Sequence, residues 1–332
     1  MSCIIIANTR GGKDLSISAP TQINTRLTNF DNLKALLIFL VIFGHLIEPL
    51  IYDNAWIKLI YVFIYSFHIP AFIYITGRFS KPKIKKTLYL LFLYLIFQFA
   101  YTPFLHYFWK KDITLNFTTP HWLLWYLFSI VLYSSLSFIL PKKPSQKTKT
   151  LLFVSSLLFA VAIGFIPFVE SEFALSRTFS FLPFFVAGKY SLLGKVRSGQ
   201  AWVYGLLSFL LTFIYAILSH NNQIALYQKY GYTHQASTWY WRLFIILIAF
   251  CWIRFLMSVS PNKKIFLISN IGKHTLFIYL IHGFVVKLLI YYLFPYFSTL
   301  LCFIFSIIIL LGLFGLSCWR ERVTEKIKIF KN

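Results

Sequence analysis

The chain has 332 residues, of which 58% are hydrophobic and only 12% are charged. Lys and Arg outnumber Asp and Glu by 32 to 9, giving a formal net charge of +23. A soluble domain carries about 25% charged residues, and apolar runs of roughly 18 to 23 residues match the length of a transmembrane helix. Composition therefore excludes a soluble enzyme, a disordered chain and a collagen-like chain, and the unbroken apolar runs argue against an outer-membrane barrel.

The apolar runs predict an all-α polytopic membrane protein with about ten transmembrane helices. In chain order, the expected spans are 33–51, 57–77, 88–108, 121–140, 151–168, 178–194, 201–219, 239–258, 271–293 and 297–319. The sixth is the weakest, because proline, glycine and lysine interrupt its apolar run. Residues 1–30 are expected to form a cytoplasmic arm that is partly disordered, 31–319 the membrane domain, and 320–332 a basic cytoplasmic tail.

Basic residues gather on alternate sides of these spans. One side holds 25 Lys and Arg residues and the other holds 6, with Lys287 inside a span. Because cytoplasmic loops carry the excess of Lys and Arg, both termini are expected in the cytoplasm of a multi-pass cell-membrane protein. The surplus cations are then expected to face anionic membrane lipid rather than nucleic acid. No connection is long enough for a soluble domain, so the chemistry must lie in or beside the bilayer.

The first span carries a polar stripe. Lys34 and His45 are 11 residues apart, which places them on one helix face about 16 Å apart along the axis. Asp31 can pair with Lys34, and Glu48 can orient or charge the imidazole of His45. Polar groups inside spans are costly and are therefore candidates for function. Each also has a plainer interpretation: Lys34 as a snorkelling flank, His45 as a packing residue, Glu48 as a solvated carboxylate.

Two further histidines, His68 in the second span and His282 in the ninth, lie at a similar expected depth. Three imidazoles at one depth favour proton transfer, although each alone is also consistent with a structural role. Five cations follow the second span within nine residues: Arg78, Lys81, Lys83, Lys85 and Lys86. They are either a topology signal or a phosphate site, and charge alone does not separate these readings. Cysteine and histidine spacing predicts no metal site.

The spacing of Asp31, Lys34 and His45 resembles the Arg-x10-His motif of the membrane-bound acyltransferase-3 family. Lys34 replaces the usual Arg, as in the branch that contains fucose 4-O-acetylases. Four further segments are similar to motifs of that branch and occur in the same order: FHIPAFIYITG, HWLLWYLFSIVLY, FLPFFVAGKY and GKHTLFIYLIH. The resemblance extends from Asp31 to His282 and so covers most of the chain.

This resemblance implies transfer of an acyl group, most often acetyl from acetyl-CoA, to a hydroxyl of a cell-surface polysaccharide or its lipid-linked precursor. The essential pair of the family corresponds to Lys34 and His45. Lys in place of Arg keeps the charge but loses the bidentate fork. The family also uses a basic pair after the second span, for which the candidates here are Arg78, Lys81, Lys85 and Lys86.

The predicted mechanism is acyl transfer across the membrane, with acetyl-CoA as co-substrate and no metal. His45 is the expected general base, Glu48 would increase its basicity, and His68 would stabilise the oxyanion or relay the proton. Donor contacts are expected from Asp31, Lys34, Arg78, Lys81, Lys85 and Lys86, and acceptor contacts from Trp125, His282 and Arg242. The main rival is a transporter or flippase for lipid-linked sugars. A third reading is a sensor or scaffold in which the histidines only pack.

Overall fold

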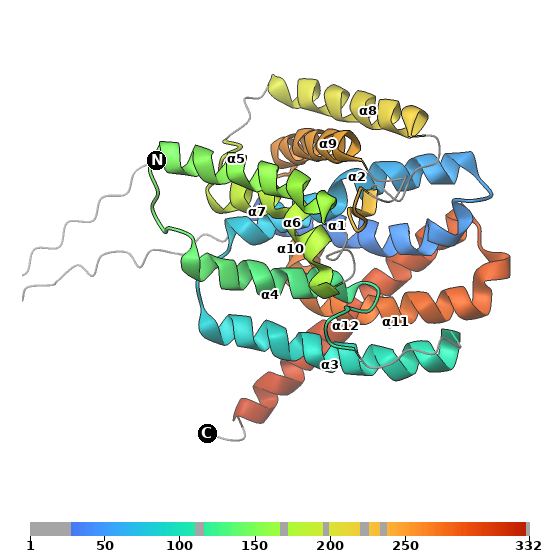
Figure 1. Cartoon of the computed structure of the whole chain (residues 1–332). Coiled ribbons are helices and arrows are strands. Elements are labelled where there is room, and N and C mark those ends of the chain that lie inside the picture. The colour runs from blue at the N-terminus through green and yellow to red at the C-terminus, as the bar shows by residue number, and fades with distance from the viewer. Residues whose placement is uncertain are drawn as a thin grey trace, which may run out of the picture.

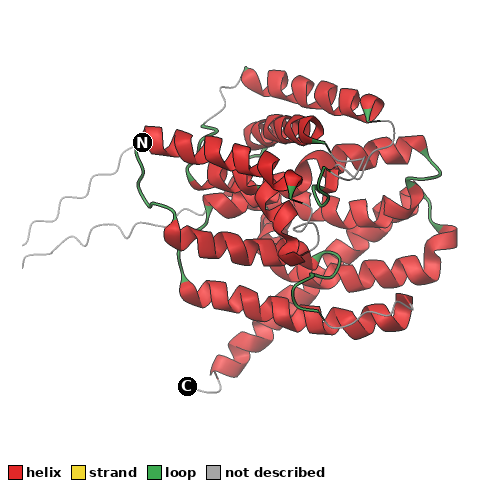
Figure 2. Ribbon diagram, viewed as in Figure 1, coloured by secondary structure: helices red, strands yellow, loops and turns green. Residues whose placement is uncertain are grey.

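The computed structural model describes residues 28–109, 116–166, 172–194, 199–219, 226–232 and 238–329. Within these ranges the secondary structure is helical throughout, with no strand (Figure 2). The all-α prediction is therefore confirmed for the part of the chain that is described. The predicted N-terminal arm falls outside the described residues, except for its last three positions, where the first helix begins.

Most helices follow one another through short connections (Figure 1). In order they are α1 (Thr28–Ile47), α2 (Ala55–Arg78), α3 (Ile84–Trp109), α4 (Leu124–Ile139), α5 (Gln146–Ala162), α6 (Leu175–Ser180), α7 (Leu182–Lys189), α8 (Gln200–Leu218), α9 (Trp239–Val259), α10 (Phe266–Lys273), α11 (Thr275–Leu293) and α12 (Thr299–Ile329). Short 3-10 turns extend α1, α5 and α11, at Glu48–Leu50, Ile163–Phe165 and Phe294–Tyr296, and another precedes α6 at Glu172–Ala174.

Eight of the described helices are long and apolar enough to cross a membrane, namely α1, α2, α3, α5, α8, α9, α11 and α12. This confirms a polytopic membrane protein. The predicted span 121–140 is the 16-residue helix α4, which at 1.5 Å per residue is only about 24 Å long. The predicted span 178–194 is divided into α6 and α7, which meet at Phe181. The count of ten spans and the orientation of the termini thus stay predictions.

Two other predicted boundaries differ from the structure. The predicted span 271–293 is broken at His274, which ends α10 and precedes α11. Helix α12 continues well beyond 319, so the predicted tail begins as helix rather than as loop. Apolar pattern locates a run of buried or lipid-facing residues, but it does not reveal a break inside the run.

Helices α1 and α2 form the centre of the molecule. Both are buried along most of their length, whereas α3, α5 and α8 expose most of theirs. In Figure 1 helix α8 lies along one edge and α3 along the opposite edge, with α1 between them. The exposed side chains on these outer helices are large and apolar, such as Phe92 and Leu206. This is the arrangement expected where hydrocarbon, not water, surrounds a bundle.

Glycines allow α2 and α7 to cross backbone against backbone. A Cβ atom on Gly77 would overlap the carbonyl oxygen of Phe185, and one on Gly188 would overlap the carbonyl oxygen of Tyr74. Small residues permit this close approach between helices in membranes. Both glycines lie in segments that the family resemblance singled out. Their role there is explained by packing, since the crossing presses α7 against the half of α2 that follows His68.

Candidate active site

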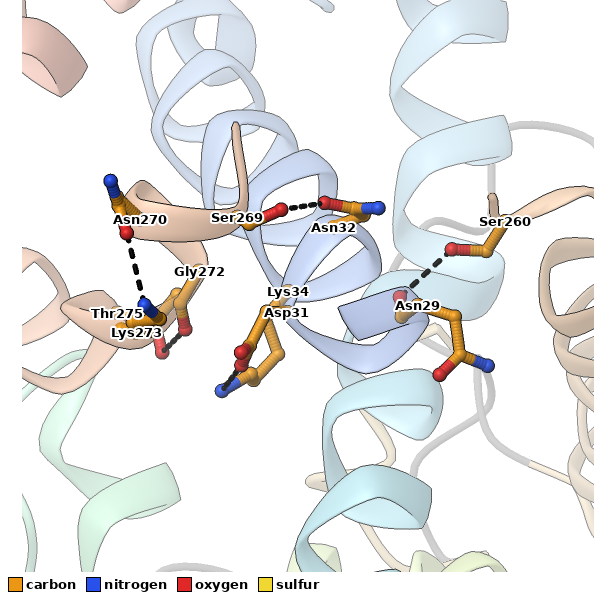
Figure 3. Close-up of polar contacts among 10 residues, drawn as sticks. All are labelled: Asn29, Asp31, Asn32, Lys34, Ser260, Ser269, Asn270, Gly272, Lys273 and Thr275. Atoms are coloured by element: carbon orange, nitrogen blue, oxygen red, sulfur yellow. Dashed lines mark hydrogen bonds and ion pairs between the residues drawn. The ribbon is translucent and has the colours of Figure 1, made fainter. Parts of the chain in front are cut away.

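Polar side chains hold the start of α1 against the segment that leads into α10 (Figure 3). The side-chain amide of Asn32 donates a hydrogen bond to the carbonyl of Pro261 at 2.8 Å and its oxygen accepts one from Ser269 Oγ at 2.6 Å. Ser260 Oγ donates to the carbonyl of Asn29 at 2.8 Å. These bonds fix the first turn of α1, and with it the side chains that project from that turn.

The predicted pair of Asp31 and Lys34 forms at this point. Lys34 Nζ lies 2.8 Å from Asp31 Oδ1, and Asp31 is only 3% exposed. Figure 3 shows the pair on a different side of α1 from the bond between Asn32 and Ser269. Gly272 of α10 packs against the backbone of Asp31, where a Cβ atom would overlap it. The close helix crossing therefore fixes the base of the polar stripe.

His45 lies further along α1, beside the 3-10 turn that ends the helix. Its Nδ1 atom is 3.4 Å from Glu48 Oε2 and 3.2 Å from the hydroxyl oxygen of Tyr65. A carboxylate only accepts hydrogen bonds, so Nδ1 carries the proton when it bonds to Glu48, and Nε2 then keeps its lone pair. This is the tautomer that a general base acting through Nε2 requires.

The three predicted histidines form one cluster. The His45 ring centroid lies 5.8 Å from that of His282, and the two rings are nearly parallel. His68 lies on the far side of Tyr65, whose ring centroid is 4.7 Å from that of His68 and 6.3 Å from that of His45. Trp122 covers the imidazole of His45 with a centroid separation of 4.7 Å. The similar depth predicted for these imidazoles thus corresponds to proximity in space.

Backbone carbonyls orient the other two imidazoles. His68 Nδ1 donates to the carbonyl of Ile64 at 2.8 Å, and His282 Nδ1 donates to that of Tyr279 at 2.7 Å. Since a carbonyl only accepts, each neutral ring keeps its lone pair on Nε2. Both side chains are almost fully buried, and His282 Nε2 has no hydrogen-bond partner among the described residues. Each neutral ring can therefore accept a hydrogen bond at Nε2.

One pocket of about 820 Å³ connects these features, a volume typical of sites for small ligands. At the start of α1 it is lined by Asp31, Lys34, Phe79, Lys86 and Thr275. Its middle is lined by His45, Tyr65, His68, Trp122, Trp125 and Tyr126, and its far part by Glu48, Arg177, Tyr227, Lys229 and Tyr230. The pocket thus passes His45 and reaches the regions around both ends of α1.

Comparison with known proteins identifies the family. The family model for the acyltransferase domain, of the acyltransferase-3 family, matches residues 27–318. The chain belongs to this acyltransferase family. Family membership and the eight candidate spans together identify a multi-pass membrane acyltransferase that acts on groups other than aminoacyl groups. The recognition made from the motifs is therefore confirmed.

Two curated relatives share short stretches with this acyltransferase-family chain. Nodulation protein NolL of Mesorhizobium japonicum is 40% identical over 83 residues, which cover 24% of this chain and 22% of the relative. NolL of Sinorhizobium fredii is 40% identical over 67 residues, covering 19% and 18% respectively. The chain thus aligns with less than a quarter of either relative. No solved structure matches it.

The structure brings most of the predicted site residues of this family member together, but not all. Those on the pocket wall are Asp31, Lys34, His45, Glu48, His68, Lys86 and Trp125. Arg78 at the end of α2, Lys81 in the connection that follows and Lys85 in the first turn of α3 do not line the pocket. His282 does not line it either and lies against the ring of His45. Among the described residues, no group of three His, Cys, Asp or Glu side chains is placed to hold a metal ion.

Arg242, an expected acceptor contact, lies away from the pocket. It is 1% exposed and donates to the carbonyls of Ala160 at 3.1 Å and Tyr230 at 2.9 Å. Its guanidinium also lies 5.0 Å from the ring of Tyr232. Through these contacts Arg242 links α9 to α5 and to the segment 226–232. The sequence predicted an acceptor contact for Arg242, whereas its backbone partners come from elements distant along the chain.

The structure adds Tyr65 and Arg177, to which the sequence analysis gave no role, to the pocket wall. Tyr65 contacts both His45 and His68, and its position three residues before His68 was an available signal. Trp122, beside His45, has a φ of 34°, which is uncommon for a bulky residue and indicates local backbone strain. Lys287, the cation inside a span, lies 4.5 Å from the Trp122 ring. Arg177 on the far wall had no distinguishing signal beyond its charge.

Proposed function

We propose that this protein transfers an acetyl group from acetyl-CoA on the cytoplasmic side to a hydroxyl of a cell-surface polysaccharide or its lipid-linked precursor. The observation that carries the proposal is the pocket that passes His45 and reaches the regions around both ends of α1. A donor entering beside Lys34 and an acceptor entering beside Glu48 would meet at His45. Family membership supports acyl transfer as the reaction.

Cations at the start of α1 suit the phosphates of the donor. Lys34 and Lys86 line the same part of the pocket, and the ion pair with Asp31 holds Lys34 in place. Arg78, Lys81 and Lys85 lie between the last residue of α2 and the first turn of α3 and are proposed to bind phosphate outside the pocket. The extended arm of acetyl-CoA would then run along the polar stripe of α1, about 16 Å to His45.

The chemistry proposed at His45 is direct transfer. Nε2 of His45 takes the proton of the acceptor hydroxyl while the hydroxyl oxygen attacks the thioester carbon. The carbon–sulfur bond breaks as the ester bond forms, and the CoA sulfur leaves with the proton that His45 returns. Glu48 stabilises the imidazolium that exists between these steps. The hydroxyl of Tyr65, beside the same ring, is a donor within reach of the oxyanion.

His68 is assigned the relay role rather than oxyanion stabilisation. Its Nδ1 proton is committed to the carbonyl of Ile64, so the neutral ring offers only a lone pair at Nε2. An oxyanion needs a hydrogen-bond donor. A relay towards His45 needs a group that accepts a hydrogen bond from the substrate hydroxyl. His282 is proposed to support the His45 ring by stacking rather than to bind the acceptor directly.

The decisive experiment compares wild-type protein with His45→Ala. Surface-glycan acetylation should fall by about 10²-fold or more in cells that carry the variant, because a general base contributes 10² to 10⁴. Purified His45→Ala should still bind acetyl-CoA and unfold at the wild-type temperature. Acetylation near the wild-type level would refute the proposal. Loss of the glycan itself from the surface, rather than of its acetyl groups, would favour the flippase interpretation.

A further inference from the structure

The part of the pocket beyond His45 is cationic. Arg177 of α6 and Lys229 of the segment 226–232 both line it, and Arg177 lies over Trp125 of the middle part. If the start of α1 is cytoplasmic, as the loop charges predict, this is the outer part of the pocket. Cations there are not explained by the positive-inside rule, which places them on the opposite side.

No carboxylate among the described residues supplies a countercharge to the guanidinium of Arg177. Its buried Nε also has no hydrogen-bond partner among these residues. Its Cζ lies 4.6 Å from the ring of Trp125. Burial lowers the pKa of Arg177 to about 10, so the group is still a cation at neutral pH. Arginines inside proteins are normally paired, because an uncompensated buried charge is costly.

Neighbouring polar groups on this wall already have partners. Glu48, the carboxylate that lines the same part, contacts Nδ1 of His45 through Oε2. The hydroxyl of Tyr227 is bonded to that of Tyr61 at 2.6 Å. Lys229 Nζ lies 5.0 Å from the ring of Tyr230, an aromatic contact rather than an ion pair. Among the described residues that line this part of the pocket, Arg177 and Lys229 therefore give an excess of positive charge over Glu48.

We propose that Arg177, assisted by Lys229, binds an anionic group of the acceptor, so that the substrate is an acidic or phosphate-bearing glycan. This inference rests on the proposed acyl transfer and names its substrate class. A guanidinium stacked on an aromatic ring keeps its in-plane N–H groups free, and their fork matches the two oxygens of a carboxylate or phosphate. The anion would hold the sugar in the outer part of the pocket with a hydroxyl directed towards His45.

Three probes separate charge from sugar shape in a binding measurement on the purified full-length protein. Methyl β-glucuronide carries a carboxylate, glucose 1-phosphate carries a phosphate, and methyl β-glucoside is the neutral match. One of the anions should bind at least about tenfold more tightly than the neutral glycoside, and Arg177→Gln should remove this preference. The anion that is preferred identifies whether a uronate or a phosphate is recognised.

Controls keep the result interpretable. Arg177→Lys should retain part of the preference, and Lys229→Gln should weaken it by a smaller factor than Arg177→Gln. Arg322→Gln, the same change at an exposed position of α12, should leave it intact. Equal binding of the three probes, no binding of either anion, or an unchanged preference in Arg177→Gln would overturn the inference. Any of these together with loss of acetylation in His45→Ala would leave the proposed function standing.

Discussion

At the scale of single residues, the surroundings of His45 define what its ring can do. Glu48 and Tyr65 both face Nδ1, and Trp122 covers the ring. The spacing of three residues predicted the contact with Glu48, because i and i+3 share a helix face. Tyr65 and Trp122 come from α2 and from the loop before α4, so their contacts depend on how these elements pack.

Replacing Glu48 by Gln tests the proposed charge stabilisation. A glutamine oxygen can still accept the Nδ1 proton of His45, but it cannot stabilise an imidazolium by charge. We expect acetyl transfer to fall by about 10- to 100-fold, with acetyl-CoA binding unchanged. Glu321→Gln is a matched control, because Glu321 Oε1 lies 3.5 Å from His274 Nδ1 outside the pocket lining. Transfer within twofold of wild type in Glu48→Gln would contradict this role.

Lys34→Ala tests the donor site. Removing the ammonium should weaken acetyl-CoA binding by about tenfold or more, the expected effect of losing one charge-assisted contact to phosphate. Lys34→Arg keeps the charge and should be tolerated. Titration of the purified protein with acetyl-CoA measures both.

Because Asp31 is buried, Lys34→Ala also leaves it without its partner in the ion pair, which by itself destabilises α1. The double variant Asp31→Asn with Lys34→Ala removes both charges. It should regain thermal stability but not affinity for acetyl-CoA. Recovery of affinity in the double variant would mean that Lys34 serves only to neutralise Asp31.

At the scale of secondary-structure elements, helix crossings at glycine position the site. The crossing of α2 and α7 places Gly77 and Gly188 each against a backbone carbonyl of the other helix, and Gly272 brings α10 onto Asp31. All three glycines lie in segments that resemble family motifs. The sequence therefore indicated where such residues occur, while the structure explains them as points of contact between helices.

Gly77→Ala should destabilise the protein, because the added methyl group overlaps a carbonyl that belongs to a packed helix. Overpacking of this kind costs about 1 to 3 kcal/mol of unfolding free energy. Gly312→Ala is the matched control, since a Cβ atom there has no neighbour within 4 Å. Thermal unfolding in detergent should show a lower midpoint for Gly77→Ala alone. Equal midpoints for the two variants would contradict the proposed crossing.

At the scale of the whole molecule, orientation rests on the distribution of 25 against 6 basic residues. The long helices have apolar outer surfaces, but such surfaces do not indicate which end faces the cytoplasm. The orientation matters for the proposed function, because it decides which end of the pocket would receive acetyl-CoA.

Cysteine labelling tests this orientation. In a background in which the native cysteines are replaced, Tyr52→Cys should react with an impermeant maleimide on intact cells. Tyr52 is 81% exposed and follows the end of α1. Lys143→Cys, in the exposed connection between α4 and α5, should react only after permeabilisation. The reverse pattern would invert the molecule and exchange the proposed donor and acceptor sides.

The amino-acid sequence alone was sufficient to predict the fold class, most helix positions and the polar stripe of α1. Each of these depends on local properties, namely apolar run length and the angle between residues on one helix. Packing alone decided that Tyr65, Trp122 and Arg177 line the pocket and that Arg242 does not. These residues come from elements distant along the chain. What a buried side chain contacts depends on its neighbours in space rather than on its residue type.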